Sequence, residues 1–350
     1  MSELQEKLCE MAQPTYRAGQ VTEWLYKKRV DAIDKMTNLP QSVRAGLTES
    51  FSLSKIDIAR VLGAPDATQK FLFRLADANL IESVLIPASP ALYGKKSDRR
   101  TICVSTQVGC AYGCKFCASG LEGFSRNLRA NEIVDQIIAI ERATNEKIDN
   151  VVFMGMGEPL ANFDNVLRAI QIINAPWGLA IGARRITVST SGLAPQIRKL
   201  AREPLQIRLA ISLHGATDEV RNQIMPINRR YNLDTLLSAC DYYVAHKKQR
   251  LTFEYILIAG VNDFDEQARL LSGHARRLAA KVNLIPYNAV SGLPWARPSP
   301  SRQEKFLSIL HAEGVPATLR REKGHDIDAA CGQLRLQTKQ AMDDSRLLSF

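Results

Sequence analysis

Three cysteines lie close together in Cys110-Ala-Tyr-Gly-Cys114-Lys-Phe-Cys117, which has the spacing C-x3-C-x2-C. Cysteine thiolates are the usual protein ligands of iron–sulfur clusters. Three closely spaced thiolates can hold three corners of a cubane, and the fourth iron is then left without a protein ligand. S-adenosylmethionine can fill that position through its amino and carboxylate groups. An electron from the cluster then breaks a carbon–sulfur bond and yields a 5′-deoxyadenosyl radical, while the protein orients the reaction.

A structural zinc site is the competing interpretation of these cysteines. Cys103 lies seven residues before Cys110 and would complete a tetrahedral four-thiolate site. Zinc ribbons, however, usually pair two C-x2-C knuckles, and this region has one. Cys103 also falls within a strand pattern, from which it would have to point toward the loop. The spacing therefore favours a [4Fe–4S] cluster on Cys110, Cys114 and Cys117.

Alternating strands and helices surround this motif and must position it. The expected strands are TICVSTQV, NVVFM, RITVS, QIRLAIS, TFEYILI and KVNLIPY, followed by helical patterns within residues 132–142, 165–173, 194–201, 233–245, 264–278 and 302–313. Six such units predict an α/β fold with a parallel sheet covered by helices. Because a closed TIM-type barrel needs eight units, we expect a partial, open (β/α)6 barrel. Its functional loops should follow the carboxyl ends of the strands.

The remaining sequence divides into smaller parts around this barrel. Residues 1–60 are expected to form a helical N-terminal accessory domain that binds RNA, with helices near 15–26 and 41–51. Residues 61–95 contain FLFRL and LIESVLI around a polar turn, which predicts a β-hairpin connection. The barrel is expected over residues 96–325, and residues 326–350 form a C-terminal segment.

The composition indicates a cytoplasmic protein with an anionic partner. The chain of 350 residues has no apolar run of the roughly 18 residues that span a bilayer, and its first residues are polar rather than signal-like. Lys and Arg exceed Asp and Glu by 46 to 36, a net charge of +10. This surplus favours RNA but does not prove it. Its clusters are Lys95-Lys96 with Arg99-Arg100, Arg184-Arg185, Arg229-Arg230, Lys247-Lys248 with Arg250, Arg276-Arg277, and Arg320-Arg321 with Lys323.

Several chemically active residues follow the predicted strands. Gly155-Met-Gly-Glu158 follows NVVFM, and other polar side chains end RITVS, QIRLAIS and KVNLIPY, so all should meet at one rim. Leu160 replaces the third glycine of a dinucleotide fingerprint, and Glu158 would repel a pyrophosphate. A carboxylate suits a cationic amino group instead, such as that of S-adenosylmethionine.

The ordered motifs of the chain resemble those of one family. They are Gln107-Val-Gly-Cys110, Gly123-Phe-Ser-Arg126-Asn127-Leu128, Gly155-Met-Gly-Glu-Pro-Leu160, Val188-Ser-Thr-Ser-Gly192, Ile211-Ser-Leu-His214, Met225-Pro-Ile-Asn228, Ile285-Pro-Tyr-Asn288 and Asp326-Ile-Asp-Ala-Ala-Cys-Gly-Gln333. With the C-x3-C-x2-C signature, they resemble the radical S-adenosylmethionine enzymes that methylate C2 of an adenine in ribosomal RNA. The resemblance runs from about residue 14 to 340. Related enzymes that methylate C8 share most of these motifs and remain an alternative.

This resemblance implies roles for individual residues. It assigns cofactor binding to Gly157, Glu158, Ser189, Ser212, Leu213, His214 and Asn288. Cys331 would be methylated by one S-adenosylmethionine, and a second one would generate the radical that activates this methyl group. Cys103 would resolve the resulting protein–RNA link as a disulfide with Cys331. Glu82 would be the proton acceptor, although the sequence by itself favours an exposed strand carboxylate there.

The resemblance also implies partners and leaves choices open. The expected substrate is 23S rRNA, with tRNA as an additional candidate, and the expected electron donor is a flavodoxin or ferredoxin. We expect a monomer and no membrane partner. The loop Ala118-Ser119-Gly120 departs from the Ser-Thr version common in the family, which puts the target atom and tRNA activity in question. A zinc-bound RNA-binding module without catalysis is the remaining alternative.

Overall fold

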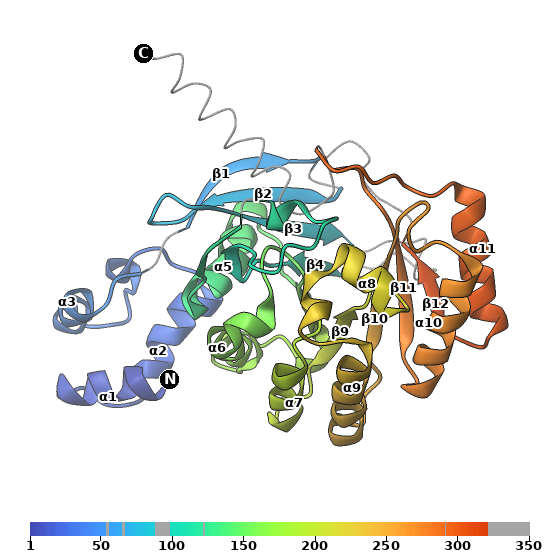
Figure 1. Cartoon of the computed structure of the whole chain (residues 1–350). Coiled ribbons are helices and arrows are strands. Elements are labelled where there is room, and N and C mark those ends of the chain that lie inside the picture. Colours follow the sequence, from blue (N-terminus) through green and yellow to red (C-terminus); the bar gives the residue numbers. More distant parts are fainter. Residues whose placement is uncertain (54–55, 65–66, 88–98, 122, 291, 321–350) are drawn as a thin grey trace, which may run out of the picture.

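The computed structural model describes residues 1–53, 56–64, 67–87, 99–121, 123–290 and 292–320. One mixed sheet has the strand order β1-β2-β3-β4-β7-β8-β9-β10-β11-β12, and a separate two-stranded sheet pairs β5 with β6 (Figure 1). Its strands are β1 (Asp57–Leu62), β2 (Gln69–Arg74), β3 (Leu80–Pro87), β4 (Arg100–Cys103), β7 (Asn150–Phe153), β8 (Ile186–Thr190), β9 (Arg208–Ser212), β10 (Thr252–Leu257), β11 (Lys281–Pro286) and β12 (Ala317–Leu319).

The parallel part of the sheet runs from β4 to β12. Helices on one face of it connect successive strands (Figure 1). They are α5 (Ala130–Thr144), α6 (Phe163–Asn174), α7 (Ala194–Arg202), α9 (Leu233–Lys247), α10 (Asp265–Arg277) and α11 (Pro300–Ala312). The predicted α/β fold with an open sheet is confirmed. Strand β12, which the sequence pattern did not reveal, extends the parallel part by one strand.

The two faces of the sheet have different chemistry because successive side chains in a strand point to opposite sides. The helix-covered face is apolar and includes the buried side chains of Ile102, Val151, Val188, Ile211 and Phe253. On the opposite face the register aligns Ser212 of β9 with Glu254 of β10, and Glu254 with Asn283 of β11. A face lined by polar side chains is unsuited to a hydrophobic core. It is the face on which a polar ligand can be held.

Three antiparallel strands extend the sheet beyond β4. The predicted hairpin is formed by β2 and β3, and its turn places Ala78 in the left-handed region (φ 63°), next to an Asn79 N–H that donates to Asp77 Oδ1. Strand β1 adds a third strand that the sequence analysis did not identify. In this antiparallel part Val84 lies opposite both Lys70 and Cys103.

The predicted strand TICVSTQV is wrong as a single element. Strand β4 ends at Cys103, and β5 (Gln107–Gly109) leaves the main sheet to pair with β6 (Phe124–Asn127). The break is fixed by Ser105, whose hydroxyl donates to the Glu82 carbonyl (2.6 Å) and accepts from the Met156 N–H (2.9 Å). Ser105 and Thr106 thus hold this part of the chain against the loop after β7, which contains Met156. The β5–β6 pair carries the cysteine segment.

The N-terminal helices have their own small core. They are α1 (Ser2–Glu10), α2 (Arg17–Thr22), the continuing turn η1 (Glu23–Lys27) and α3 (Gln41–Ser50). Leu8, Val21, Met36 and Leu47 are buried among them, separately from the barrel core. Arg29 Nε joins this module to the barrel through Glu141 Oε2 of α5 at 2.7 Å. None of the helices in the described ranges is long and apolar enough to cross a membrane.

Candidate active site

The cysteine segment forms a tight loop after β5. The Cys110 N–H donates to the Gly123 carbonyl (2.9 Å), and the Lys115 N–H donates to the Ile224 carbonyl of α8 (Asp218–Ile224) at the same distance. Gly113 has a φ of 58°, and a Cβ at Gly120 would lie 3.3 Å from the Gly113 Cα. Small residues therefore allow the loop to fold back on itself.

The three cysteines of this loop line one cavity of about 280 Å³. Five residues assigned to cofactor binding also line it, namely Gly157, Glu158, Ser189, Ser212 and His214. Leu213 is buried but does not line the cavity; its N–H donates to the Glu254 carbonyl at 3.0 Å. Asn288 follows β11 and is half-buried outside the lining. The fold thus gathers most of the predicted cofactor residues on the polar face.

The three thiols are compatible with a multi-iron cluster, in which each would bind a different iron. In the part of the chain that the structure describes, no three His, Cys, Asp or Glu side chains converge on one ion. A cubane spreads three thiolates over three irons, so it does not require that convergence. Cys103 is buried on β4 and does not line the cavity, which argues against a fourth thiolate ligand.

Burial makes the uncompensated thiolates unfavourable. Burial raises the pKa of Cys110 to about 12, and the negative charges of Cys117 and Glu158 add to the rise. The pKa of Cys114 is raised well above its ordinary value, again mainly by burial. Thiolates in this loop therefore need positive charge beside them, which iron provides.

Glu158 is held rigidly at the edge of the cavity. Its Oε2 accepts hydrogen bonds from the N–H (2.7 Å) and hydroxyl (2.8 Å) of Ser191, and its Oε1 accepts from the Leu160 N–H (3.0 Å). Gly157 precedes it with a φ of +96°, and a Cβ there would come within 2.5 Å of Gln107. Burial raises the pKa of Glu158 despite these bonds. A cationic amino group would restore the ionised form.

His214 supplies a fixed neutral imidazole. Its Nδ1 accepts a hydrogen bond from the Ile256 N–H at 3.0 Å, so the ring proton is on Nε2. Burial lowers its pKa to about 3, and the charge of Arg221 adds to this effect. The ring meets Phe116 of the cysteine loop edge-on, with centroids 4.9 Å apart. His214 therefore stays neutral at physiological pH and offers a donor at the cavity wall.

Glu82 and Cys103 share one face of the sheet. Glu82 is two residues before Val84 on β3, and Val84 lies opposite Cys103 on β4. Glu82 is only 1% exposed, so the interpretation as an exposed carboxylate is wrong. Its Oε2 lies 3.7 Å from the Nζ of Lys70, which is equally buried. Cys331 and the rest of the predicted segment 326–350 lie outside the described residues.

Sequence reasoning did not assign three charged or amide residues of the cavity to the site: Glu254, Asn283 and Arg320. Glu254 receives a hydrogen bond from Asn283 Nδ2 at 2.7 Å, and burial raises the pKa of Glu254 to about 7. Arg320, just after β12, completes this side of the lining. Strand alternation was the available signal, because polar residues at 254 and 283 interrupt apolar runs at the spacing of one face.

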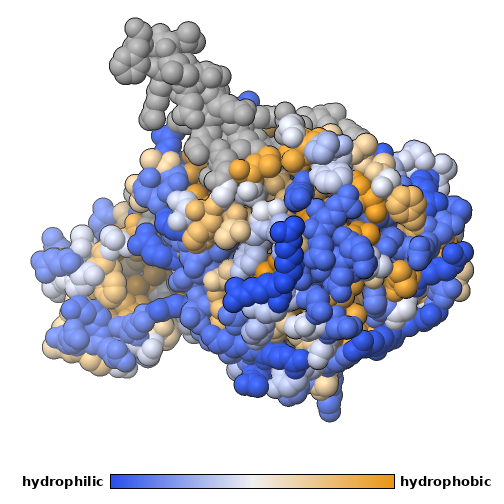
Figure 2. All heavy atoms as spheres, viewed as in Figure 1, coloured by the Kyte–Doolittle hydropathy of each residue, from blue (hydrophilic) through white to orange (hydrophobic). Residues whose placement is uncertain are grey.

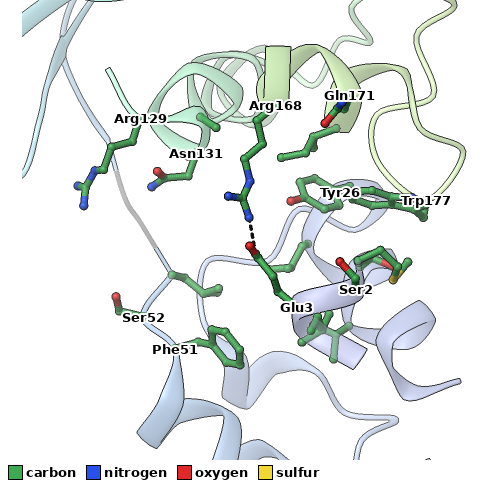
Figure 3. Close-up of a pocket in the computed structure, with 18 of the residues that line it drawn as sticks. Ser2, Glu3, Tyr26, Phe51, Ser52, Arg129, Asn131, Arg168, Gln171 and Trp177 are labelled. Atoms are coloured by element: carbon green, nitrogen blue, oxygen red, sulfur yellow. Dashed lines mark hydrogen bonds and ion pairs between the residues drawn. The ribbon is translucent and has the colours of Figure 1, made fainter. Parts of the chain in front are cut away.

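A larger cavity of about 930 Å³ lies elsewhere, between the N-terminal helices and α5 and α6. Figure 3 shows Arg168 reaching Glu3 across it, with Tyr26 and Trp177 on one side. Apolar residues are visible in this hollow in Figure 2, between the N-terminal helices and the barrel. It contains no cysteine or other predicted catalytic residue, and its lining fits an interface between two modules.

Comparisons with known proteins agree with this geometry. A family model described as "Radical SAM superfamily" matches residues 104–271, and one described as "Ribosomal RNA large subunit methyltransferase N-terminal domain" matches residues 1–53. The crystal structure of a radical SAM methyltransferase from Sphaerobacter thermophilus is similar with a TM-score of 0.88 and 46% identity, covering 95% of this chain and 96% of that one.

Fold and cysteine loop together define a radical SAM enzyme, whose cofactors are a [4Fe–4S] cluster and S-adenosylmethionine. Two similar curated proteins show which family of radical SAM enzymes this chain belongs to. The probable dual-specificity RNA methyltransferase RlmN of Akkermansia muciniphila is 52% identical over 95% of this chain and 93% of the relative. The probable dual-specificity RNA methyltransferase RlmN 3 of Opitutus terrae is 53% identical over 97% of this chain and 93% of the relative. The chain belongs to the RlmN family of RNA methyltransferases.

Proposed function

We propose that this protein methylates C2 of an adenine in 23S rRNA through an S-methylcysteine intermediate on Cys331. The observation that carries the proposal is the cavity that the cysteine loop lines together with Glu158 and His214. Glu82 and Cys103 lie on the adjacent strands β3 and β4, outside that lining. The relatives named dual-specificity RNA methyltransferases support RNA as the substrate. Transfer RNA is the second proposed substrate, and the cytoplasm is the proposed location.

The cavity residues have distinct tasks in this proposal. Cys110, Cys114 and Cys117 would hold the cluster, which together with S-adenosylmethionine supplies radical chemistry when bound. Glu158 would receive the amino group of S-adenosylmethionine, since its carboxylate is already oriented by Ser191 and Leu160. His214 would donate from Nε2 and is fixed by Ile256.

Glu82 and Cys103 act after a carbon of Cys331 has become bonded to the target base. Glu82 would accept the proton from the target carbon, and the electrons of that C–H bond restore the aromatic ring. The Cys103 thiol then loses its proton and attacks the Cys331 sulfur, forming a disulfide. The bond between that sulfur and the transferred carbon breaks, its electron pair stays on the carbon, and the carbon takes up a proton to become the methyl group. A reductant of the thiol class returns both cysteines to thiols for the next turnover.

The substrate explains why this machinery is needed. An aromatic C–H at C2 of adenine is neither acidic nor nucleophilic enough for polar methyl transfer. The base must also leave its stack to reach a buried cavity, as in other enzymes that act on bases. The N-terminal helices would hold folded RNA by its shape and phosphates. A flavodoxin or ferredoxin is the proposed electron donor, and the protein would act as a monomer.

Some of the basic clusters are better placed for RNA than others. Arg276 and Arg277 form ion pairs with Glu313 and Asp241, and Arg185 pairs with Asp149 at 3.5 Å. Arg229 and Arg230 are also exposed, but no carboxylate among the described residues forms an ion pair with either of them. They follow α8, to which the cysteine loop is hydrogen-bonded, and are the proposed phosphate contacts at the cavity.

Mass spectrometry of 23S rRNA and tRNA nucleosides from cells that lack the gene tests this function. Loss of 2-methyladenosine, with its return on complementation, supports the proposal. Loss of 8-methyladenosine would assign the alternative C8 activity, and unchanged nucleosides would refute RNA methylation. Complementation with Cys331→Ala should fail although the purified variant keeps its iron. Cys9→Ala is the matched control, because Cys9 lies on α1, and should restore methylation.

A further inference from the structure

Arg221 on α8 is the largest side chain that the structure buries completely, with an exposed fraction of 0%. A charged side chain is rarely buried without a partner of opposite charge, because removing it from water costs several kcal/mol. The reaction steps proposed above do not use this guanidinium.

The direct hydrogen-bond acceptors of Arg221 are neutral. Its Nε donates to Asn228 Oδ1 at 2.8 Å, and its two Nη atoms donate to the backbone carbonyls of Ser191 (3.1 Å), Ser212 (3.2 Å) and Leu213. Within the described ranges no carboxylate forms an ion pair with it. Asp218 is separated from it by the Asn228 amide, which donates to Asp218 Oδ1 at 2.8 Å.

These carbonyls belong to the segments that form the cofactor side of the cavity. Ser191 binds Glu158, and Ser212 lines the cavity at the end of β9. Leu213 immediately precedes His214. A Cβ at Gly215 would lie 3.0 Å from the Arg221 Cγ, so the chain packs closely around this side chain. One guanidinium therefore fixes the spacing between the ends of β8 and β9.

Arg221 also lies close to the cysteine loop. The Lys115 N–H, next to Cys114, donates to the carbonyl of Ile224, which is on the same helix as Arg221. A guanidinium stays protonated in proteins, so Arg221 is positively charged at neutral pH. A [4Fe–4S] cluster with three thiolate ligands carries a net negative charge, which compensates a buried cation.

We propose that Arg221 is a positioning residue of the cofactor site, which fixes the S-adenosylmethionine-contacting ends of β8 and β9 and places a buried positive charge beside Cys114. This inference rests on the proposed cluster ligands. A nearby cation makes it easier to add an electron to an anionic cluster, so Arg221 raises the reduction potential of the cluster. Its bridging of three carbonyls keeps the binding segments in place before S-adenosylmethionine arrives.

Two substitutions separate the charge from the geometry. Arg221→Gln removes the charge, whereas Arg221→Lys keeps it but loses the planar fork that reaches several acceptors. Arg202→Gln is the matched control, because Arg202 is exposed on α7 and bonds Tyr242. The measurements are the midpoint potential of the reconstituted cluster, by EPR-monitored titration, and the dissociation constant of S-adenosylmethionine.

The expected pattern differs between the two variants. Arg221→Gln should lower the midpoint potential, whereas Arg221→Lys and Arg202→Gln should keep that of the wild type. Both Arg221 variants should bind S-adenosylmethionine about tenfold more weakly, which corresponds to the loss of roughly one charge-assisted hydrogen bond. A purely structural role would change stability and iron content without separating glutamine from lysine in potential.

A wild-type potential in iron-loaded Arg221→Gln would overturn the proposal. If Arg221→Gln cannot be reconstituted with iron, the Arg221→Lys variant tests the proposal instead. Wild-type affinity of Arg221→Lys for S-adenosylmethionine would overturn the proposal. Weakened affinity together with a wild-type midpoint potential would support it. Cys114→Ala distinguishes a failure of the underlying assignment. If Cys114→Ala retains a full cluster, the proposed ligands are wrong, whatever the Arg221 variants show.

Discussion

Replacing Lys70 by Met should destabilise the protein strongly, because it leaves the Glu82 carboxylate buried without its ammonium partner. Both side chains are 1% exposed, and Lys70 Nζ lies 3.7 Å from Glu82 Oε2. Two unit charges at this separation attract each other by about 4 kcal/mol at an effective dielectric constant of about 20. Breaking a buried pair typically costs about 3–5 kcal/mol.

A double-mutant cycle isolates this interaction. We expect Lys70→Met and Glu82→Gln each to lower the free energy of unfolding by about 3–5 kcal/mol. The double variant should lose about 4 kcal/mol less than the sum of the two single variants. The attraction between the two charges is removed in each single variant, but it is lost only once in the double variant. Urea unfolding of the cluster-free protein, followed by circular dichroism at pH 7, measures all four free energies.

An exposed ion pair provides the control for the cycle. Lys199 Nζ lies 3.0 Å from Asp164 Oδ1, and both side chains are largely exposed. Its coupling energy should stay below about 1 kcal/mol. Additive single substitutions at positions 70 and 82 would refute the reasoning, since they would mean that these buried charges do not depend on each other.

Three further predictions concern the cavity and the N-terminal module. Glu158→Gln should weaken S-adenosylmethionine binding in calorimetry at least tenfold, by loss of the charge that receives the amino group, with unchanged iron content; equal affinity would contradict this role. Burial raises the pKa of Glu254 from its ordinary value of 4.5 to about 7. Between these two pH values the folded state keeps a proton on Glu254 that the unfolded state has lost. The stability of the wild type should therefore fall as the pH rises from 4.5 to about 7. Glu254→Gln should flatten this dependence in urea unfolding at pH 5 and 7, and an unchanged slope would place the titration elsewhere. Arg29→Ala, which removes the bond to Glu141, should increase protease cleavage between the N-terminal module and the barrel, and unchanged cleavage would show that other contacts hold the module.

The sequence reveals the barrel because its signals are periodic and local. Apolar runs such as NVVFM and RITVS became β7 and β8, and the intervening amphipathic patterns became the covering helices. The convergence of Glu158, Ser189 and Ser212 follows from parallel strands having their carboxyl ends at one edge. These inferences require only strand direction and alternation.

What the sequence could not reveal depends on tertiary pairing. The break after Cys103 needs the bonds of Ser105 to Glu82 and Met156, which come from other elements. The burial of Glu82 follows from its place on an inner strand beside Lys70, whereas the isolated LIESVLI pattern favours an exposed carboxylate. Arg221 is seven residues past His214, and nothing in its local pattern distinguishes it from a surface arginine.

The proposed chemistry depends on an iron that three thiolates leave free to bind S-adenosylmethionine beside Glu158. Electron–nuclear double resonance of the reduced, reconstituted cluster, with S-adenosylmethionine labelled with 15N at its amino group, tests this directly. We predict a 15N hyperfine coupling in the wild-type protein. Wild-type protein that carries four irons and binds S-adenosylmethionine but shows no such coupling would contradict the open iron site.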